Sequence, residues 1–244
     1  MSNAESAGPF RRRRFVIAAI AVGAIVLLGA VAIIASLLAG GNDEEAEPTP
    51  TTSVSSSTDA SDPDPSVCGL DGYEEGSSLD APPTNEWELV GTVAAPLSDD
   101  AGPGVVENNG FRNCYAHTAE GALFAAVNYT AVGTDATLAP QLPGLVATGP
   151  GRDALATQIA AAGGAPSTNA QRAQVTGYKI ASYSGDSATI DLALDYSTTG
   201  LVSLPLRLEW EGGDWKMILT DSGKPPLAPS QLENLGGYTP WGGA

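Results

Sequence analysis

The longest apolar stretch of the chain lies near its N-terminus and predicts a helix that crosses a membrane. Residues 15–39 contain no charged residue and only one weakly polar residue, Ser36. About 20 apolar residues are enough to span the hydrocarbon core of a bilayer. Four arginines come immediately before the stretch: Arg11, Arg12, Arg13 and Arg14. Because basic residues stay on the cytoplasmic side, we expect a cytoplasmic tail at 1–14 and a C-terminus outside the cytoplasm, in a single-pass protein of the cell membrane.

Two kinds of cleaved export signal are the alternatives to a retained anchor. The apolar core of a cleaved secretory signal has about 7–15 residues, which is shorter than this stretch. The run Arg12–Val16 also resembles a twin-arginine export signal, but such signals are usually less hydrophobic. The length and the apolar character of residues 15–39 therefore favour an anchor that stays in the membrane.

Residues 40–67 have the composition of a disordered tether. Gly, Asp, Glu, Pro, Ser and Thr dominate the segment, and large apolar residues are almost absent from it. Such a segment cannot bury enough apolar surface to offset the entropy that it would lose on ordering. We therefore expect an acidic Ser/Thr/Pro stalk that holds a globular domain, residues 68–244, away from the membrane.

The second half of this domain alternates between apolar and polar positions, which predicts β-strands. Apolar residues occupy every second position in Ile190–Tyr196 and again in Val202–Trp210. A strand over Ala173–Tyr183 is expected before them, and the turn Gly212–Asp214 leads into a further strand. Period-two alternation across short turns is typical of an antiparallel meander with one buried face.

The first half of the domain predicts helices and short strands. Ala119–Val132 is apolar on nearly all sides and has Thr118 as a candidate N-cap, so this helix is expected to be buried. A second helix is expected over Gly151–Ala162. A strand is expected over Glu86–Val93, and a hairpin turn at Asn109–Gly110.

The order of these elements predicts an α+β fold. Helices are followed by a curved antiparallel meander sheet, whose apolar face packs on the buried helix, and one transmembrane helix precedes the domain. The C-terminal tail, Pro225–Ala244, is rich in Pro and Gly and is expected to lie over the surface.

The chain has two cysteines, Cys68 and Cys114, and both follow the predicted anchor. An even number of cysteines outside the cytoplasm favours a disulfide bond. The bond would close a loop of about 47 residues, worth about 4 kcal/mol by chain entropy. It would tie the segment after the stalk to the start of the first helix.

The charge of the chain bears on its partners. The formal net charge is -17, and of the 28 acidic residues all but Glu5 follow residue 40, whereas four of the 11 basic residues precede it. A domain with this much negative charge repels phosphate backbones, so we expect no binding of nucleic acid by the outer domain. Its expected partners are the lipid bilayer through the anchor, and other envelope proteins or a second copy of itself.

Motifs for enzymatic chemistry are absent from the sequence. It has no Gly-rich phosphate loop, no zinc-binding pattern and no calcium loop, so we expect no cofactor, no metal site and no catalytic residues. His117 is the only histidine, and its place before a helix cap favours a structural role. Asp191 and Asp195 are further candidate pocket residues, although alternation places them opposite Leu192 and Leu194, in water or facing Arg207.

Several motifs together resemble a family of actinobacterial membrane-anchored proteins of mostly unknown function, often associated with integrative or conjugative elements. The motifs that carry the resemblance are Trp87–Gly91, Gly102–Gly104, Tyr115–Thr118, Gly121–Ala126, Leu208–Trp215 and Gly237–Gly243. The order of helices and meander is similar to the cone fold of nuclear-transport-factor-2-like proteins. The resemblance implies an outer domain like that of the bitopic inner-membrane subunit of type IV secretion machines, which is a scaffold.

Two hypotheses about function follow. The first is a non-enzymatic scaffold or interaction protein of a cell-envelope assembly, such as a conjugation or secretion machine. The second is a small-ligand-binding module, or an enzyme, that uses a cone-fold pocket. The second hypothesis requires a deep cavity with inward-facing polar groups, whereas a core filled by side chains would contradict it.

Overall fold

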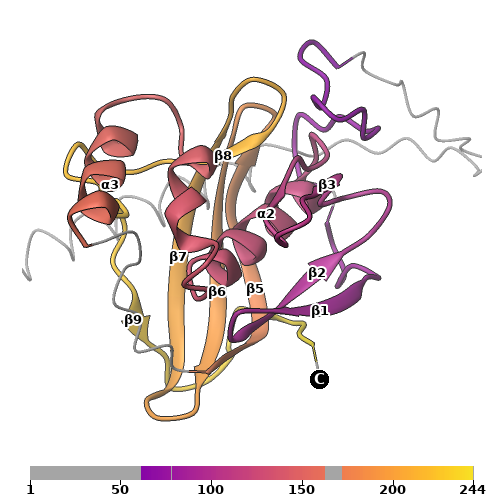
Figure 1. The fold of residues 1–244 in the computed structure, drawn as a ribbon. Coiled ribbons are helices and arrows are strands. Elements are labelled where there is room, and N and C mark those ends of the chain that lie inside the picture. Colours follow the sequence, from indigo (N-terminus) through magenta and orange to yellow (C-terminus); the bar gives the residue numbers. More distant parts are fainter. Residues whose placement is uncertain (1–61, 78, 163–171, 244) are drawn as a thin grey trace, which may run out of the picture. The chain divides into compact units, whose positions relative to one another are not determined.

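The computed structural model describes residues 62–77, 79–162 and 172–243, all of which belong to one compact unit (Figure 1). The predicted cytoplasmic tail, the predicted membrane anchor and most of the predicted stalk lie outside the described residues. Within the described ranges, no helix is both long enough and apolar enough to span a membrane. The α+β class of the domain is confirmed.

An antiparallel meander forms the largest sheet. It consists of β5 (Ala173–Ser184), β6 (Ser187–Tyr196), β7 (Gly200–Trp210) and the short β8 (Trp215–Met217), each paired with the next. The predicted strands are thus confirmed. Short turns connect them, so that each strand pairs antiparallel with its neighbour in sequence.

Helix α2 (Ala119–Val132) lies against the apolar face of this sheet (Figure 1). The helix has the predicted bounds, and Thr118 caps it by accepting a hydrogen bond from Gly121 N at 3.0 Å. Most of its residues are buried, as expected for a helix that is apolar all round. Helix α3 (Pro150–Ala161) agrees with the second predicted helix to within one residue at each end, and a 3-10 helix, η2 (Ala139–Leu145), precedes it.

The core lies between α2 and the meander. Both elements contribute fully buried large side chains: Leu123, Phe124 and Tyr129 from α2, and Ile190, Leu192, Leu194 and Leu208 from the sheet. Because alternate residues of a strand point to opposite faces, the alternation of β6 and β7 directs their apolar residues to this one layer.

Two hairpins cover the other side of α2. The expected single strand Glu86–Val93 is wrong: the structure has β1 (Glu86–Val90) and β2 (Val93–Leu97), joined at Gly91. Gly91 has φ 59°, a left-handed conformation that glycine adopts without strain, and this turns the chain back on itself. The predicted hairpin at Asn109–Gly110 is confirmed, with β3 (Val105–Val106) paired to β4 (Arg112–Asn113).

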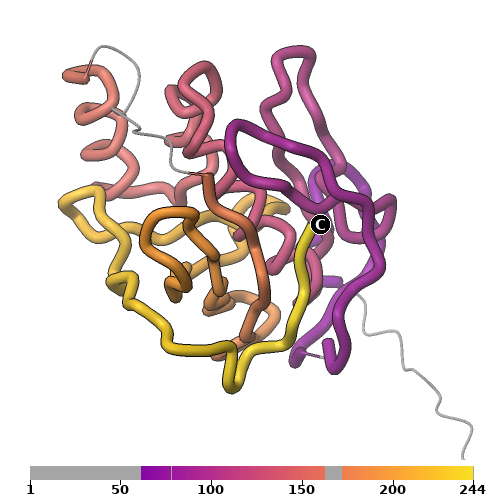
Figure 2. Tube along the Cα trace, turned by 90° about the horizontal axis from the view of Figure 1, so that it is seen from below, coloured from indigo at the N-terminus to yellow at the C-terminus, as the bar shows by residue number. Residues whose placement is uncertain are grey.

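The C-terminal tail is bound to the meander at both of its edges. Strand β9 (Ser230–Gln231) pairs with β7, and β10 (Thr239–Pro240) pairs with β5. Between them the tail crosses the meander, as Figure 2 shows from below. The Trp241 side chain that follows β10 packs against Trp87 of β1 and Phe124 of α2, with ring centroids 4.7 Å and 5.9 Å away. The tail lies over the surface as predicted, and it also adds two strands and a core side chain.

Candidate functional site

His117 is buried immediately before the cap of α2, where three segments of the chain meet. Its exposed fraction is 1%, and both ring nitrogens have partners. Nδ1 lies 2.9 Å from Oδ1 of Asp62, and Nε2 lies 2.6 Å from the carbonyl oxygen of Gly185 in the β5–β6 turn. A carbonyl oxygen only accepts, so Nε2 donates to it. A second proton on Nδ1 would make the contact with Asp62 an ion pair.

Aromatic rings surround the imidazole of His117. The indole of Trp210 stacks on it, with ring centroids 3.8 Å apart and planes 4° apart. Tyr73 and Trp215 approach edge-on, at centroid distances of 4.9 Å and 5.9 Å. The histidine is therefore enclosed and fully hydrogen-bonded, and in this position it holds segments of the fold together.

Residues 62–67, which we name the N-terminal strap, pass beside this cluster. Trp210 Nε1 donates to the carbonyl oxygen of Asp64 at 2.8 Å, Ser66 Oγ donates to that of Tyr115 at 3.1 Å, and Val67 N donates to that of Gly213 at 2.9 Å. The sequence assigned these residues to the disordered stalk, whereas the structure places them on the domain. Two of these contacts use strap side chains, Asp62 and Ser66, and two use strap backbone groups, and all of their partners lie far away in sequence, so the composition of the strap does not reveal them.

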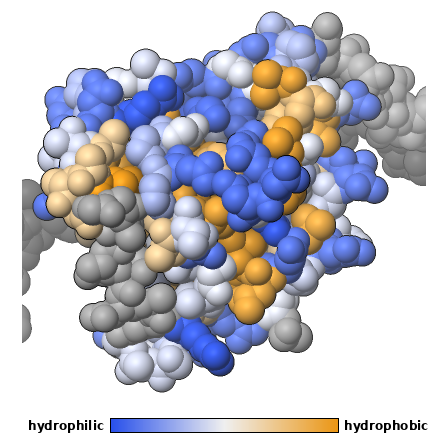
Figure 3. Space-filling view, viewed as in Figure 1, coloured by the Kyte–Doolittle hydropathy of each residue, from blue (hydrophilic) through white to orange (hydrophobic). Residues whose placement is uncertain are grey.

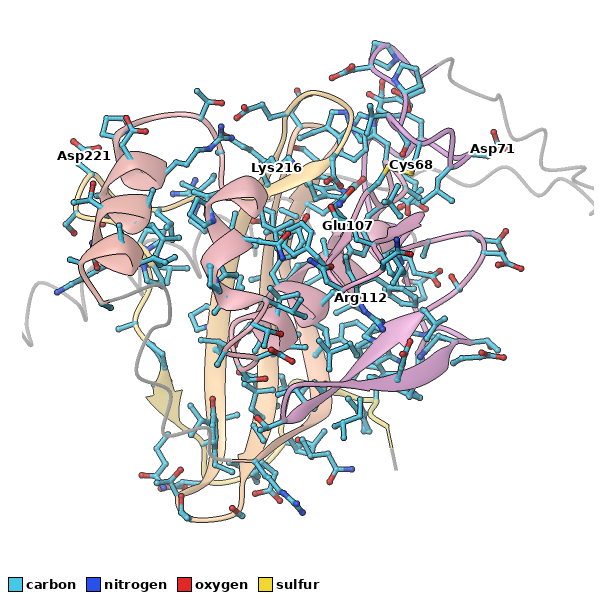
Figure 4. All side chains as sticks on the ribbon, in the orientation of Figure 1. Cys68, Asp71, Glu107, Arg112, Lys216 and Asp221 are labelled. Carbon is cyan, nitrogen blue, oxygen red and sulfur yellow. A yellow bond between two sulfur atoms is a disulfide. The ribbon has the colours of Figure 1, made fainter. Side chains whose placement is uncertain are left out.

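The predicted disulfide between Cys68 and Cys114 is confirmed, with Cα atoms 6.2 Å apart. Cys114 directly follows β4 and precedes the cap of α2, and Figure 4 labels Cys68 near the β3–β4 hairpin. The bond therefore joins the end of the N-terminal strap to the loop that leads into the buried helix. We name this region, with His117, Trp210 and Asp214, the tether junction.

Asp214 completes the tether junction from the β7–β8 turn. Its two carboxylate oxygens accept hydrogen bonds from Cys114 N at 3.1 Å and Tyr115 N at 3.0 Å, and Lys216 Nζ lies 2.9 Å from Oδ2. Burial raises the pKa of Asp214, and the Lys216 charge and these hydrogen bonds oppose the rise. The sequence indicated only a turn at this position, because no local pattern shows contacts across about 100 residues.

Arg112 is a second buried charge that the sequence did not indicate. Its side chain is 3% exposed and pairs through Nη2 with Glu88 Oε2 at 2.5 Å, which links β4 to β1 (Figure 4). Its Nε and Nη1 have no protein partner among the described residues. Buried polar groups of this kind are commonly hydrated by ordered water.

Asp191 holds the C-terminal tail on the sheet. Ser203 Oγ donates to its Oδ1 and Tyr238 OH donates to its Oδ2, each at 2.7 Å. The expectation that it lies opposite Arg207 is wrong, and its side chain is half-buried under the tail rather than fully in water. In the β6–β7 register Asp191 lies opposite Pro205, and Arg207 lies opposite Thr189. The turn that pairs Tyr196 with Gly200 sets this register. The alternation of apolar and polar residues alone does not determine it.

Asp195 is exposed near the other end of β6. It lines a surface hollow of about 500 Å³ together with Arg172, Gln174 and Gly243. His117 contacts the β5–β6 turn, whereas Asp195 lies eight residues along β6 from Ser187, roughly 25 Å in an extended strand. The candidate pocket residues therefore do not meet in one site.

The space between α2 and the sheet is filled by side chains. Surface hollows in the described part of the protein lie at loops, sheet edges, the tail and the N-terminal ends of α2 and α3. On the face drawn in Figure 3, apolar residues occur in separate patches among hydrophilic ones. Within the described ranges, no three His, Cys, Asp or Glu side chains gather as metal ligands.

Comparison with known proteins places the chain in a family without assigning it an activity. The family model described as a domain of unknown function, DUF8175, matches residues 48–240. The match includes the N-terminal strap, the helices, the meander and β10. No curated protein and no solved structure matches the chain.

Proposed function

We propose that this chain, which belongs to the DUF8175 family of domains of unknown function, is a membrane-anchored scaffold or interaction protein of a cell-envelope assembly. In this proposal residues 15–39 cross the membrane once, the N-terminus is cytoplasmic and the domain lies outside the cytoplasm. The role is non-enzymatic, without a cofactor. The resemblance to conjugation and type IV secretion subunits, with a cone-like outer domain, belongs to the same proposal.

The observation that carries the proposal is the tether junction. A force that pulls on the domain through its membrane anchor would act on the first residues of the domain. Here those residues are held by the Cys68–Cys114 bond and by the hydrogen bonds of Asp62, Ser66 and Val67. A disulfide also persists in oxidising compartments, which agrees with a domain outside the cytoplasm.

The pocket hypothesis has less support. It requires a deep cavity with polar groups inside, and the region between α2 and the meander is occupied by fully buried apolar side chains such as Phe124 and Leu192. Of its three residues, His117 is enclosed, Asp191 holds the tail and Asp195 is exposed.

A topology experiment tests the anchor. We expect a reporter enzyme that is active only outside the cytoplasm to be active when it is fused after residue 244. The matched control replaces Arg11–Arg14 with alanine, which should reduce the outward fraction because the positive charges set the orientation. Reporter activity confined to fusions before residue 15 would contradict the proposed orientation.

A crosslinking pull-down from native membranes tests the interaction role. The full chain is expected to recover other envelope proteins or copies of itself. The control is a chain with residues 15–39 exchanged for an unrelated anchor, which should recover the same partners if the domain selects them. A chain that remains a monomer and crosslinks to nothing in native membranes would contradict the scaffold proposal.

A further inference from the structure

Strand β5 has one open edge along about half of its length. On one side it pairs with β6 throughout. On the other side β10 covers only its first half, pairing Thr239 with Tyr178 and Pro240 with Gly177. No strand among the described residues pairs with that side from Lys179 to Ser184. We name residues 179–183 the open β5 edge; Figure 1 shows β5 on the side of the meander that faces the β1–β2 hairpin.

A surface hollow of about 340 Å³ lies directly beside this edge. Its lining includes Ser77, Leu79, Lys179, Ile180, Tyr183 and Thr239. Tyr178 OH donates to the carbonyl oxygen of Ala81, so the segment 79–81 is held beside β5. The hollow thus has β5 as one wall, this segment as another, and β10 near one end.

The chemistry of the hollow suits an extended peptide. In an antiparallel sheet, alternate residues of an edge strand direct their N–H and C=O groups outward, where another strand can bind them. Ile180, Leu79 and Tyr183 are partly buried apolar residues that pack against the core. Lys179, by contrast, is exposed and is the only charged residue of the lining. It lies opposite Asp191 of β6 across the sheet, and its other side faces the open edge.

We propose that the open β5 edge binds an extended segment of a partner protein as an added strand. The segment has apolar side chains at alternate positions, facing Ile180 and Leu79, and a carboxylate that faces Lys179. In such recognition the main-chain hydrogen bonds supply affinity and the side-chain positions supply specificity. This inference deepens the proposed function, on which it rests, by naming the surface and the kind of partner.

The chain itself provides the argument for this occupant. Its own β10 already adds a short strand to the same edge of β5, and Trp241 N donates to the carbonyl oxygen of Thr176 at 3.2 Å beside it. A partner strand would continue the line of β10 along the edge. The register shift of β5 between Ile180 and Ser182 limits this pairing to a short segment, because a bulge disrupts a longer ladder.

The test uses the purified full-length chain in detergent and one defined probe, the peptide acetyl-Thr-Val-Glu-Val-Thr-Val-amide. Hydrogen–deuterium exchange is measured with and without about 1 mM peptide, a concentration that detects weak binding. We expect slower exchange of the amides of residues 179–184. Two control peptides carry N-methyl groups on the odd or on the even residues. Because a strand offers alternate N–H groups to each side, one control should lose the effect and the other should keep it.

A charge reversal tests the predicted carboxylate contact. Lys179→Glu should weaken peptide binding about fivefold, because attraction across the strand pair becomes repulsion. Lys224→Glu is the matched control, since Lys224 is an exposed lysine in the turn before the tail, and it should leave binding unchanged. Unaltered exchange at 179–184, or equal protection by both methylated peptides, would overturn the inference. Protection that rises with protein concentration without peptide, together with a dimer in light scattering, would overturn it as well, because a second copy would then occupy the edge.

Failure of this inference can be distinguished from failure of the proposed function. The peptide experiment is independent of membrane orientation, and the topology experiment is independent of the β5 edge. A correct orientation combined with no peptide binding would remove only the strand-docking site.

Discussion

The imidazole of His117 stacks on the indole of Trp210, with ring centroids 3.8 Å apart and nearly parallel planes. The two residues are far apart in sequence, and each binds the N-terminal strap: His117 through the side chain of Asp62, and Trp210 through the backbone of Asp64. The strap is therefore held by an aromatic pair whose two members come from different parts of the domain.

Removal of the histidine should release the strap. In His117→Ala the carbonyl oxygen of Gly185 loses its imidazole partner, the Asp62 carboxylate keeps only its hydrogen bond from Asp64 N, and the stacked ring is lost. We expect the free energy of unfolding to fall by about 2–4 kcal/mol, the range for a buried hydrogen-bonded group together with its packing. Amide hydrogen exchange at residues 62–67 should become faster under conditions in which the rest of the domain stays folded.

The variants Asp62→Asn and Asp64→Asn distinguish a side-chain contact of the strap from a backbone contact. Asp62 uses its carboxylate, whereas Asp64 contributes its carbonyl oxygen and has an exposed side chain. Only Asp62→Asn should accelerate exchange in the strap. Equal exchange in both variants would show that the contact with His117 does not hold the strap.

Loss of the disulfide should destabilise the domain without changing its fold. In the double variant Cys68→Ser with Cys114→Ser, the unfolded chain regains the entropy of a loop of about 47 residues, so the free energy of unfolding should fall by about 4 kcal/mol in urea denaturation. Reducing agent should lower the stability of the parent protein to the same level and leave the double variant unchanged. A parent protein that is insensitive to reduction would contradict a stabilising bond.

The pH dependence of stability should include a contribution from Asp214. Its pKa is raised by burial relative to the ordinary value of 3.8, so the folded state binds a proton more readily than the unfolded state. The stability due to this group is therefore fully present below the unfolded pKa and is lost as pH rises through the raised folded pKa.

The measurement for Asp214 compares the parent protein with Asp214→Asn in urea denaturation between about pH 3.5 and 7. Asparagine cannot titrate, and its NH2 group cannot accept one of the two hydrogen bonds that the carboxylate accepts from Cys114 N and Tyr115 N, so the variant should be less stable. The difference between the two proteins should shrink as pH rises. A difference that grows with pH would mean that the hydrogen bonds and Lys216 outweigh burial.

The hydroxyl of Tyr238 should hold the C-terminal tail on the sheet. Tyr238→Phe removes one hydrogen bond to the carboxylate of Asp191 and keeps the ring, so the expected loss is about 1–2 kcal/mol, with faster exchange in residues 230–241. Tyr196→Phe is the control, because the Tyr196 hydroxyl has no hydrogen bond in the described part of the chain. Unchanged exchange in the tail of Tyr238→Phe would show that β9 and β10 hold it without this contact.

The sequence by itself determined the elements whose cause is local. The polar and apolar alternation of β6 and β7, the all-round apolar character of α2 and its Thr118 cap predicted these elements correctly, because periodicity and capping depend on neighbouring residues. The cysteine count and the predicted anchor were enough to predict the disulfide.

Tertiary structure decided the features that depend on distant partners. Asp62 binds His117 across 55 residues, and Asp214 binds Cys114 N across 100 residues, so no window of sequence contains both groups. The strap was assigned to the stalk because its partners Tyr115, His117 and Trp210 lie 49, 55 and 146 residues away in sequence. The strand register, which places Pro205 and not Arg207 opposite Asp191, arises only when the whole sheet is assembled. The partial cover of β5 by β10 arises in the same way, and it alone leaves the open edge proposed as a docking site.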